Sequence, residues 1–194
     1  MSAKGDLMTE LTRLNPSIFT VHNFLTREQC GEYIRLTEAR GYTSAPITTA
    51  HGPVHRPDIR NNTRVMYDDA TATDDLWKLA APCLEEWDAS RQPLGLNERL
   101  RFYRYDVNQQ FDWHYDGYYE RPTGERSLLT FMVYLNDDFS GGETLFRETQ
   151  VQPETGMALF FVHQIRHKGA TVTKGRKYVL RSDVMYAYGE RRFR

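Results

Sequence analysis

The segment Phe111-Asp112-Trp113-His114-Tyr115-Asp116, near the middle of the chain, constrains the fold and the chemistry more than any other stretch. It has strand character over residues 111–115, and in a strand residues i and i+2 project to the same face. His114 and Asp116 would then present an imidazole nitrogen and a carboxylate side by side. His167, on a later strand-like segment, supplies a third ligand. Two histidines and one carboxylate leave coordination positions open on a metal, which is typical of non-haem Fe(II) sites.

The third ligand has an alternative in His163, which lies four residues before His167. Because this offset is even, both histidines could project to the same face of a strand. The motif His-x-Gly-x-x-Val, which begins at His167, favours His167. His51 and His55 flank a proline and have no cysteine partners, so we interpret them as loop or substrate-entry residues and not as a zinc site.

The composition fits one domain, because 194 residues with 40% hydrophobic content can bury a sizeable core. The formal net charge of −1 at pH 7 gives no indication of bulk electrostatic binding to nucleic acid or to an anionic membrane. No apolar run is long enough for a membrane span, and residues 1–15 are too polar for a signal peptide. The two cysteines, Cys30 and Cys83, fit a reducing compartment, so we expect a cytoplasmic protein and leave its oligomeric state open.

The front half of the chain is expected to combine short strands with helices. Residues 1–16 are predicted to be loosely held. In chain order, the elements expected after them are a strand over 17–25, a helix from Thr26 to Gly41, a strand over 42–49, a long loop over 50–62, a strand over 64–68 and a helix over 73–87. Thr26 and Gln29 fit a capping box at the start of the first helix. Pro82 is expected to break or kink the second helix.

From residue 97 onward the sequence predicts a succession of strands separated by turns. The expected strands span residues 99–105, 111–115, 127–136, 143–146, 156–162, 167–172 and 177–186. Many strands at short intervals are typical of a sandwich or a double-sheet jelly roll. We therefore predict a mainly β protein with a double-stranded β-helix (jelly roll) core and two or three supporting helices. It would form one domain over 1–194, with a front part over 1–96 and the catalytic motifs in 97–188.

Five separated motifs in the second half agree in order and spacing with one known family. They are Tyr105 with His114-Tyr115-Asp116, Tyr134-Leu135-Asn136, Gly141-Gly142-Glu143-Thr144, Pro153-x-x-Gly156-x-Ala158, and His167-Lys168-Gly169 with Lys177. Together they resemble the prolyl-4-hydroxylase-like branch of the Fe(II)/2-oxoglutarate-dependent dioxygenases. The resemblance extends from about Leu100 to Tyr186.

The resemblance implies a role for each matching residue. His114, Asp116 and His167 would bind the iron. Lys177, ten residues after His167, would pair with the distal carboxylate of 2-oxoglutarate, and Arg181, four residues further on the same strand face, is the alternative partner. The remaining residues expected around 2-oxoglutarate are Tyr105, Tyr134 and Thr144. The implied cofactors are Fe(II), 2-oxoglutarate and O2, with ascorbate as a supporting reductant.

The run Arg60-Asn61-Asn62-Thr63-Arg64 is the most distinctive feature of the front half. Arginine and asparagine supply fixed donors that suit a carboxylate or amide, so Arg60, Asn62 and Arg64 are candidate substrate-binding residues. The alternative is a polar turn that leads into a strand. Trp113 and Tyr118-Tyr119 are candidates for the entrance of the site.

The function implied by the resemblance is oxidative decarboxylation of 2-oxoglutarate coupled to hydroxylation of a C–H bond. A prolyl residue, a free amino acid and a small metabolite all remain open as substrate, and the short chain slightly favours a compact one. Two other functions are weighed against this one. The first is an inactive 2-oxoglutarate- or metal-binding sensor or interaction module, and the second is a cupin-type metal enzyme that does not use 2-oxoglutarate. The intact triad together with Lys177 argues against the first, and in the second the spacing of Lys177 would be a coincidence.

Overall fold

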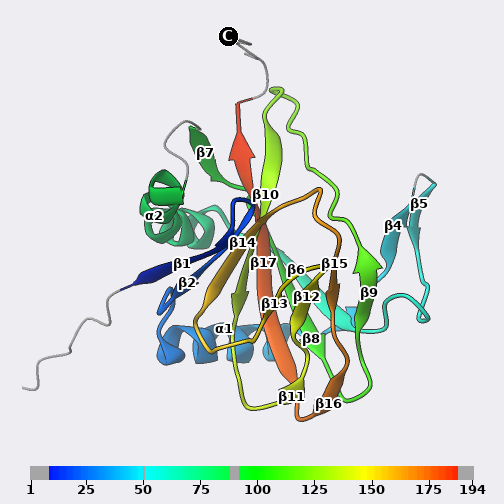
Figure 1. Ribbon diagram of the computed structural model, residues 1–194. Helices are drawn as coiled ribbons and strands as arrows, with labels where there is room; N and C mark the ends of the chain where they lie inside the picture. Colours follow the sequence, from blue (N-terminus) through cyan, green and yellow to red (C-terminus); the bar gives the residue numbers. More distant parts are fainter. Residues whose placement is uncertain (1–8, 50, 88–91, 188–194) are drawn as a thin grey trace, which may run out of the picture.

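The computed structural model describes residues 9–49, 51–87 and 92–187 (Figure 1). Within these ranges the chain forms two α-helices, α1 (Arg27–Arg40) and α2 (Ala70–Trp87), and a set of β-strands. The strands are β1 (Glu10–Asn15), β2 (Ile18–His22), β3 (Thr43–Ser44), β4 (Ile47–Thr49), β5 (Gly52–Val54), β6 (Thr63–Asp68), β7 (Pro93–Leu96), β8 (Arg99–Tyr105), β9 (Phe111–His114), β10 (Arg126–Tyr134), β11 (Ser140–Gly141), β12 (Thr144–Phe146), β13 (Gln150–Val151), β14 (Ala158–Val162), β15 (His167–Gly169), β16 (Val172–Lys174) and β17 (Lys177–Tyr186).

Two sheets make up the body of the molecule. The large sheet has the order β1-β2-β14-β10-β17-β8-β6-β3, with β7 also paired to β17, and the small sheet has the order β13-β12-β15-β9. Both helices lie on one side of the large sheet and the small sheet lies on its other side (Figure 1). The arrangement is the predicted jelly roll with its helical layer. The predicted division of the domain between residues 96 and 97 stays a prediction.

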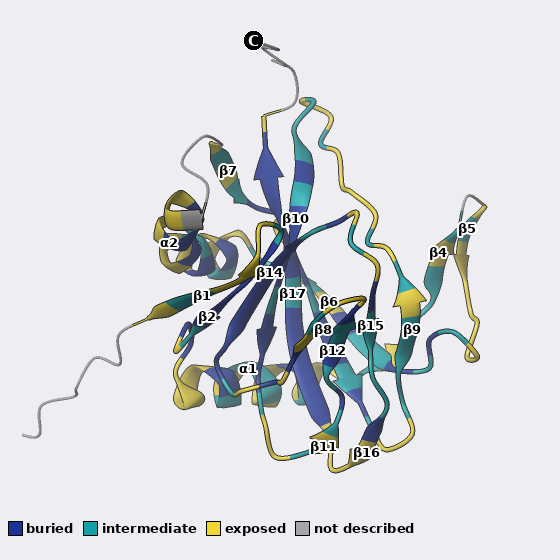
Figure 2. Ribbon diagram, in the orientation of Figure 1, coloured by how far each residue is buried: buried dark blue, intermediate teal, exposed yellow. Residues whose placement is uncertain are grey.

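Alternation along the strands explains why the large sheet is covered on both faces. Phe102 and Leu180 pack with the helices in one hydrophobic cluster, whereas their neighbours Tyr103 and Val179 pack with the small sheet in another. Successive side chains of a strand point to opposite faces, so each strand contributes to both clusters. Figure 2 shows the result, with the middle strands of the large sheet buried and the outer surfaces of the helices exposed.

The sequence signals at the ends of α1 are confirmed. The side-chain oxygen of Thr26 accepts the backbone N–H of Gln29, and the side chain of Gln29 accepts the N–H of Thr26, so the capping box is complete. Gly41 ends the helix at a φ of 80°, a left-handed conformation that glycine adopts without steric cost. Strands β8 and β17 also match the predicted ranges 99–105 and 177–186.

The prediction that residues 1–16 are loosely held is wrong for β1, while residues 1–8 lie outside the described part of the chain. β1 pairs antiparallel with β2, from Glu10 opposite His22 to Asn15 opposite Ile18. Its side chains are mostly exposed, because β1 lies at the edge of the large sheet and has a neighbouring strand on one side only. The polar sequence therefore gave no hydrophobic signal for this strand.

The second helix differs from the prediction at its start and in its middle. It begins at Ala70 and not at Thr73, and the carboxylate of Asp69 accepts the backbone N–H of Ala72 at 2.9 Å. Asp69 thus satisfies a free donor of the first turn. The helix continues through Pro82, because its apolar side packs on the large sheet while the proline is exposed.

The region predicted as a strand over 42–49 and a loop over 50–62 is divided differently. Ala45 and Pro46 separate β3 from β4, and β4 pairs with β5 in a hairpin that is not part of either sheet. The hairpin projects beside β9 in Figure 1. Ile47 and Thr48 of this hairpin line the cavity that also contains His114, Asp116 and His167, so the segment forms part of the site described next.

Candidate active site

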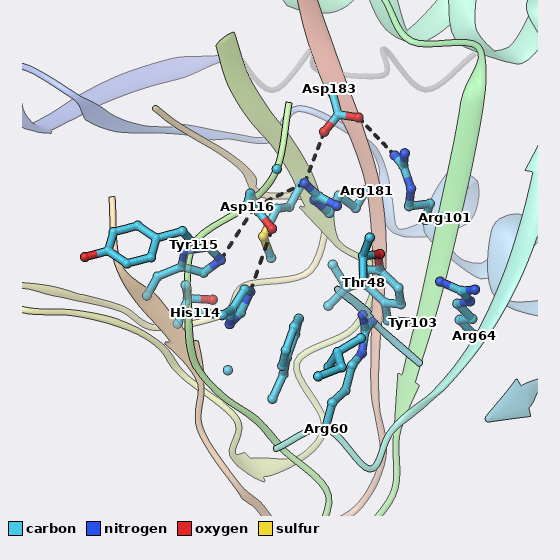
Figure 3. A pocket seen from close by; sticks show the side chains of 18 of the residues that line it. Thr48, Arg60, Arg64, Arg101, Tyr103, His114, Tyr115, Asp116, Arg181 and Asp183 are labelled. Atoms are coloured by element: carbon cyan, nitrogen blue, oxygen red, sulfur yellow. Dashed lines mark hydrogen bonds and ion pairs between the residues drawn. The ribbon is translucent and has the colours of Figure 1, made fainter. Parts of the chain in front are cut away.

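His114, Asp116 and His167 come together in the small sheet. His114 ends β9 and His167 begins β15, and the two residues lie directly opposite each other in the antiparallel pair. Asp116 follows β9 and reaches both rings, with 3.7 Å from Oδ1 to His114 Nε2 and 3.6 Å from Oδ2 to His167 Nε2 (Figure 3). One ligand atom from each residue lies within 4.8 Å of the others, and no second such cluster occurs in the described ranges.

Backbone carbonyl groups fix both imidazole rings. His114 Nδ1 lies 2.7 Å from the carbonyl oxygen of Asp112, and His167 Nδ1 lies 3.0 Å from that of Ile165. Each Nδ1 therefore carries the proton and each Nε2 keeps a free lone pair that faces the centre of the cluster. Burial, helped by the neighbouring His167, lowers the pKa of His114 to about 3, and burial also lowers the pKa of His167. Neutral imidazoles with free Nε2 atoms suit metal binding.

The carboxylate of Asp116 is held by two donors. Thr130 Oγ1 donates to Oδ2 at 2.6 Å, and Arg181 Nη2 lies 3.1 Å from the same oxygen. Burial alone would raise the pKa of Asp116, but the charge of Arg181, together with the hydrogen bond from Thr130, outweighs it and lowers the pKa. The carboxylate is therefore ionised and oriented without any metal present.

His163, the alternative ligand, is fully buried and belongs to a chain of hydrogen bonds that reaches Asp116 through Thr130. The N–H of Tyr119 donates to Ser127 Oγ at 2.8 Å, Ser127 Oγ lies 2.8 Å from His163 Nε2, and His163 Nδ1 lies 3.0 Å from Thr130 Oγ1. Since the hydroxyl hydrogen of Thr130 goes to Asp116, Thr130 must accept from His163. His163 thus acts through Thr130 to hold Asp116 and does not face the cluster.

Replacing Thr130 with valine is expected to weaken metal binding while the protein still folds. The variant removes the donor to Asp116 and leaves His163 Nδ1 without its acceptor, and the loss of such outer contacts typically costs about 10–100-fold in metal affinity. Titration of Co(II) into the parent, Thr130→Val and Thr130→Ser measures the effect. The serine variant keeps the hydroxyl and should bind nearly as the parent does. Equal affinity of the valine variant and the parent would contradict the assigned chain.

Lys177 is buried and lines the same cavity. Its Nζ donates to the carbonyl oxygen of Gly142 at 2.5 Å and lies 5.4 Å and 5.2 Å from the ring centres of Tyr105 and Tyr134. The hydroxyl of Tyr134 lies 2.6 Å from Thr144 Oγ1. The structure thus groups four of the five residues that the sequence assigned to a 2-oxoglutarate pocket. Tyr105, Thr144 and Lys177 line the cavity, whereas Tyr134 does not.

No carboxylate lies within ion-pair distance of Lys177 in the described part of the chain. Burial lowers the pKa of Lys177 to about 7, and the more distant Glu143 offsets only part of this effect. A buried amine without an anionic partner is costly, so the pocket fits a ligand that brings a carboxylate.

The lowered pKa of Lys177 has a consequence for stability. Between pH 7 and the ordinary lysine value of 10.5, the unfolded chain holds the proton and the folded chain does not. The free energy of unfolding of the cofactor-free protein should therefore gain a contribution as pH rises through this range. Denaturant unfolding at pH 7 and pH 9 should show a larger increase for the parent than for Lys177→Met. An equal change in both proteins would contradict the assigned burial of the charge.

Arg181, the alternative anchor for 2-oxoglutarate, already pairs with two carboxylates. Its Nη2 lies 3.1 Å from Asp116 Oδ2 and 3.1 Å from Asp183 Oδ1, and Asp183 Oδ2 lies 3.0 Å from Arg101 Nη1 (Figure 3). Burial would lower the pKa of Arg181, but Asp116 and Asp183 outweigh it and raise the pKa. The guanidinium thus neutralises acidic groups of the protein itself.

The three candidate substrate-binding residues have different positions. Arg60 lines the cavity, and its guanidinium carbon lies 4.6 Å and 4.3 Å from the ring centres of Tyr103 and Phe111. Arg64, on β6, also lines the cavity. Asn62 is fully buried and does not line it; its Oδ1 accepts from Arg60 Nε at 2.7 Å. Asn62 therefore orients Arg60.

The cavity has a volume of about 620 Å³ and an aromatic entrance. Tyr115, Tyr118 and Tyr119 line it and are exposed, whereas Trp113 is exposed but lies outside the lining. Tyr103 lines the interior and was not among the residues expected from the sequence. Its place on β8, two residues before Tyr105, was the available signal for a shared face.

Comparisons with known proteins agree with this geometry. A sequence model described as the 2OG-Fe(II) oxygenase superfamily matches residues 100–182. Prolyl 4-hydroxylase 13 of Arabidopsis thaliana is 26% identical over 85% of this chain and 69% of its own length. Probable prolyl 4-hydroxylase 3 of the same plant is 25% identical over 75% of this chain, which spans 50% of that relative.

Solved structures show the same fold. The viral collagen prolyl hydroxylase of Paramecium Bursaria Chlorella virus-1, in a 2-oxoglutarate complex, superposes with a TM-score of 0.68 at 19% identity, over 88% of this chain and 97% of the other. The Pseudomonas putida prolyl-4-hydroxylase superposes with a TM-score of 0.64 at 14% identity, over 89% of this chain and 94% of the other.

The jelly roll, the His-Asp-His cluster and the matched sequence together define a class of protein. The chain is similar to the 2OG-Fe(II) oxygenase superfamily over residues 100–182, where the three cluster residues lie. The relatives named above are prolyl 4-hydroxylases, and these matches confirm the resemblance found in the sequence. No helix in the described ranges is long and apolar enough to cross a membrane.

Proposed function

We propose that this protein hydroxylates prolyl residues in a peptidyl substrate, with Fe(II) bound by His114, Asp116 and His167 and 2-oxoglutarate bound beside it. One observation supports the proposal above the others. The His-Asp-His cluster and the buried Lys177, which lacks a carboxylate partner among the described residues, line a single cavity of about 620 Å³. The cavity therefore combines a site for a divalent metal with a site for an anionic co-substrate.

The protein residues have separate tasks in this proposal. His114 and His167 present free Nε2 atoms, and Thr130 and Arg181 hold the carboxylate of Asp116 in its ionised form. Lys177 binds the distal carboxylate of 2-oxoglutarate, since Arg181 is already paired. When bound, the iron and 2-oxoglutarate supply the oxidising chemistry that side chains lack.

Tyr105, Tyr134 and Thr144 complete the proposed 2-oxoglutarate pocket. Tyr105 and Tyr134 present their rings to the ammonium group of Lys177, and such contacts stabilise a desolvated cation. The bond between Tyr134 and Thr144 keeps both hydroxyl groups satisfied in a buried region. The walls thereby exclude water around the anchor.

A peptidyl substrate is supported by the relatives and by the cavity entrance. The named relatives are prolyl 4-hydroxylases, and a similar prolyl hydroxylase from Trichoplax adhaerens was solved with a hypoxia inducible factor peptide fragment. The exposed Tyr115, Tyr118 and Tyr119 form an aromatic rim, which suits an extended, proline-containing chain. Cys30 and Cys83 are both buried free thiols, and we place the reaction in the cytoplasm.

The proposed activity is tested by following two products together. The protein is incubated with Fe(II), ascorbate, 2-oxoglutarate and a library of capped prolyl peptides, and succinate and a mass increase of one oxygen atom are measured. Equal amounts of succinate and hydroxylated peptide are expected. Metal and 2-oxoglutarate binding without either product would indicate a sensor or interaction module. Peptide oxidation that does not need 2-oxoglutarate would indicate a cupin-type enzyme.

A further inference from the structure

We infer that the substrate carries a carboxylate, which binds to Arg60 and Arg64 beside the metal centre. The inference rests on the proposed function and narrows its substrate to acidic prolyl peptides. The acidic group could be an aspartate or glutamate side chain close to the target proline or the terminal carboxylate of the peptide. The two sources share the same chemistry, and the experiment below separates them.

The charges that line the cavity are strongly unbalanced. Its lining contains five cationic residues and two acidic residues, namely Arg60, Arg64, Arg101, Lys177 and Arg181 against Asp116 and Asp183. The ferrous ion and the 2-oxoglutarate dianion of the proposed function carry opposite charges of equal size and leave this excess unchanged. A positive cavity with low-dielectric walls concentrates anionic ligands.

Three of the five cations are already used. Arg101 and Arg181 pair with Asp183, and Arg181 also pairs with Asp116. Lys177 is the proposed anchor for 2-oxoglutarate. Arg60 and Arg64 remain, and neither forms an ion pair with any residue in the described ranges. These two arginines therefore account for two of the three excess positive charges, and Lys177 accounts for the third.

Arg60 is built into the wall as a fixed donor. It is only 7% exposed, Asn62 Oδ1 accepts from its Nε, and the rings of Tyr103 and Phe111 pack against its guanidinium. Its Nη2 is buried and has no hydrogen-bond partner among the described residues. A buried guanidinium donor without an acceptor is costly and is satisfied best by an oxyanion. Because rings pack against the guanidinium, its free donors lie at its edge, which suits a planar carboxylate.

The position of Arg60 connects it to the reacting centre. Phe111, which contacts the guanidinium of Arg60, stacks on His114 with ring centres 3.5 Å apart and planes at 13°. An anion at Arg60 thus lies one aromatic ring away from a proposed iron ligand. A carboxylate near the target proline could bind there while the proline faces the metal.

Arg64 adds positive charge to the same wall of the cavity, and the pKa of Tyr103 reflects this positive environment. Arg64 lies directly opposite Tyr103 in the antiparallel pair of β6 and β8, so both project to the same face of the sheet. Burial raises the pKa of Tyr103, yet the charges of Arg60 and Arg181 outweigh it and lower the pKa. Arg181 Nε is a second buried guanidinium nitrogen without a partner in the described part of the cavity wall. Each observation indicates a wall that is short of negative charge.

The test compares capped prolyl peptides that differ in a single charge. Glutamate or glutamine is placed on either side of one proline, and a third peptide has glutamine at these positions and a free terminal carboxylate. Binding is measured calorimetrically on protein loaded with Zn(II) and 2-oxoglutarate, which needs no turnover. We expect the glutamate or free-acid peptide to bind about tenfold more tightly than the glutamine peptide, as for a charge-assisted bidentate pair. The tighter of the two acidic peptides identifies the source of the carboxylate.

Variants then show which residues cause the preference for acidic peptides. Arg64→Gln removes the charge of an arginine that forms no ion pair in the described ranges. Arg60→Lys keeps the charge but loses the planar guanidinium group with its paired donors. Each variant should reduce the acid preference several-fold. The control Arg147→Gln changes an exposed arginine outside the cavity lining and should leave it intact. Equal binding of acidic and neutral peptides, including no binding of either, would overturn the inference, as would a preference untouched in both variants. Acid-selective binding without succinate formation would overturn the proposed function alone.

Discussion

The variant His114→Ala is expected to lose both metal binding and turnover. The imidazole supplies one of three ligand atoms that lie within 4.8 Å of one another, and its ring is oriented by Asp112 and by stacking on Phe111. Losing an outer-shell partner costs roughly 10–100-fold in metal affinity, so losing a ligand itself should cost more than about a hundredfold. Calorimetric titration with Co(II) measures the affinity, and succinate formation measures turnover.

The control for this variant is another histidine outside the cavity lining. His22 on β2 lies 3.0 Å from Glu154 and is part of the surface, so His22→Ala should bind metal and turn over as the parent does. His163→Ala should have an intermediate affinity, because it reaches Asp116 only through Thr130. If His114→Ala bound Co(II) as tightly as the parent, the assigned ligand set would be wrong.

The variant Lys177→Met is expected to weaken 2-oxoglutarate binding while leaving the metal site intact. Removing one partner of a buried charge pair costs about 2–5 kcal/mol, so the dissociation constant of 2-oxoglutarate should rise about 30-fold or more. Methionine has a similar length and needs no hydration, so the cofactor-free variant should unfold at the same or a higher denaturant concentration than the parent. Weaker ligand binding with unchanged or higher stability would distinguish a binding residue from a structural one.

A second lysine gives the matched control. Lys174 on β16 is exposed, and Lys174→Met should change neither 2-oxoglutarate binding nor stability. Anaerobic titration of 2-oxoglutarate into the Fe(II) protein gives the affinity through its metal-to-ligand absorption. Should Lys177→Met bind 2-oxoglutarate as the parent does, the distal carboxylate would have to bind elsewhere, with Arg181 as the next candidate.

The parts of the site that the sequence predicted are those determined by local periodicity and motif order. His114 and Asp116 are two residues apart, which predicted that both project in the same direction. Lys177 and Arg181 are four residues apart in one strand, which placed them on the same face. The capping box of Thr26 and Gln29 gave the start of α1, because that signal lies within four residues. Each of these features depends on neighbours in the chain and not on distant contacts.

The features that the sequence did not predict depend on contacts between distant segments. β1 is a strand because β2 lies beside it, and α2 continues through Pro82 because its apolar side is packed on the large sheet. The pairing of Arg181 with Asp116 joins residues far apart in the chain. Arg60 and Tyr103, which are in contact, are also far apart in the chain. The roles of Arg181 and Arg60 could therefore not be assigned from sequence spacing alone.

The two halves of the site stand on different layers of the molecule. His114 and His167 belong to the small sheet, whereas Lys177 belongs to the large sheet, and a hydrophobic cluster that includes Leu159 and Phe161 holds the layers together. The thickness of that cluster therefore sets the span between metal and anchor. In the proposed function, we expect this span to suit the five-carbon 2-oxoglutarate better than shorter or longer dicarboxylic oxo acids. Selectivity for the co-substrate would then depend on core packing, including residues such as Leu159 and Phe161 that do not line the cavity.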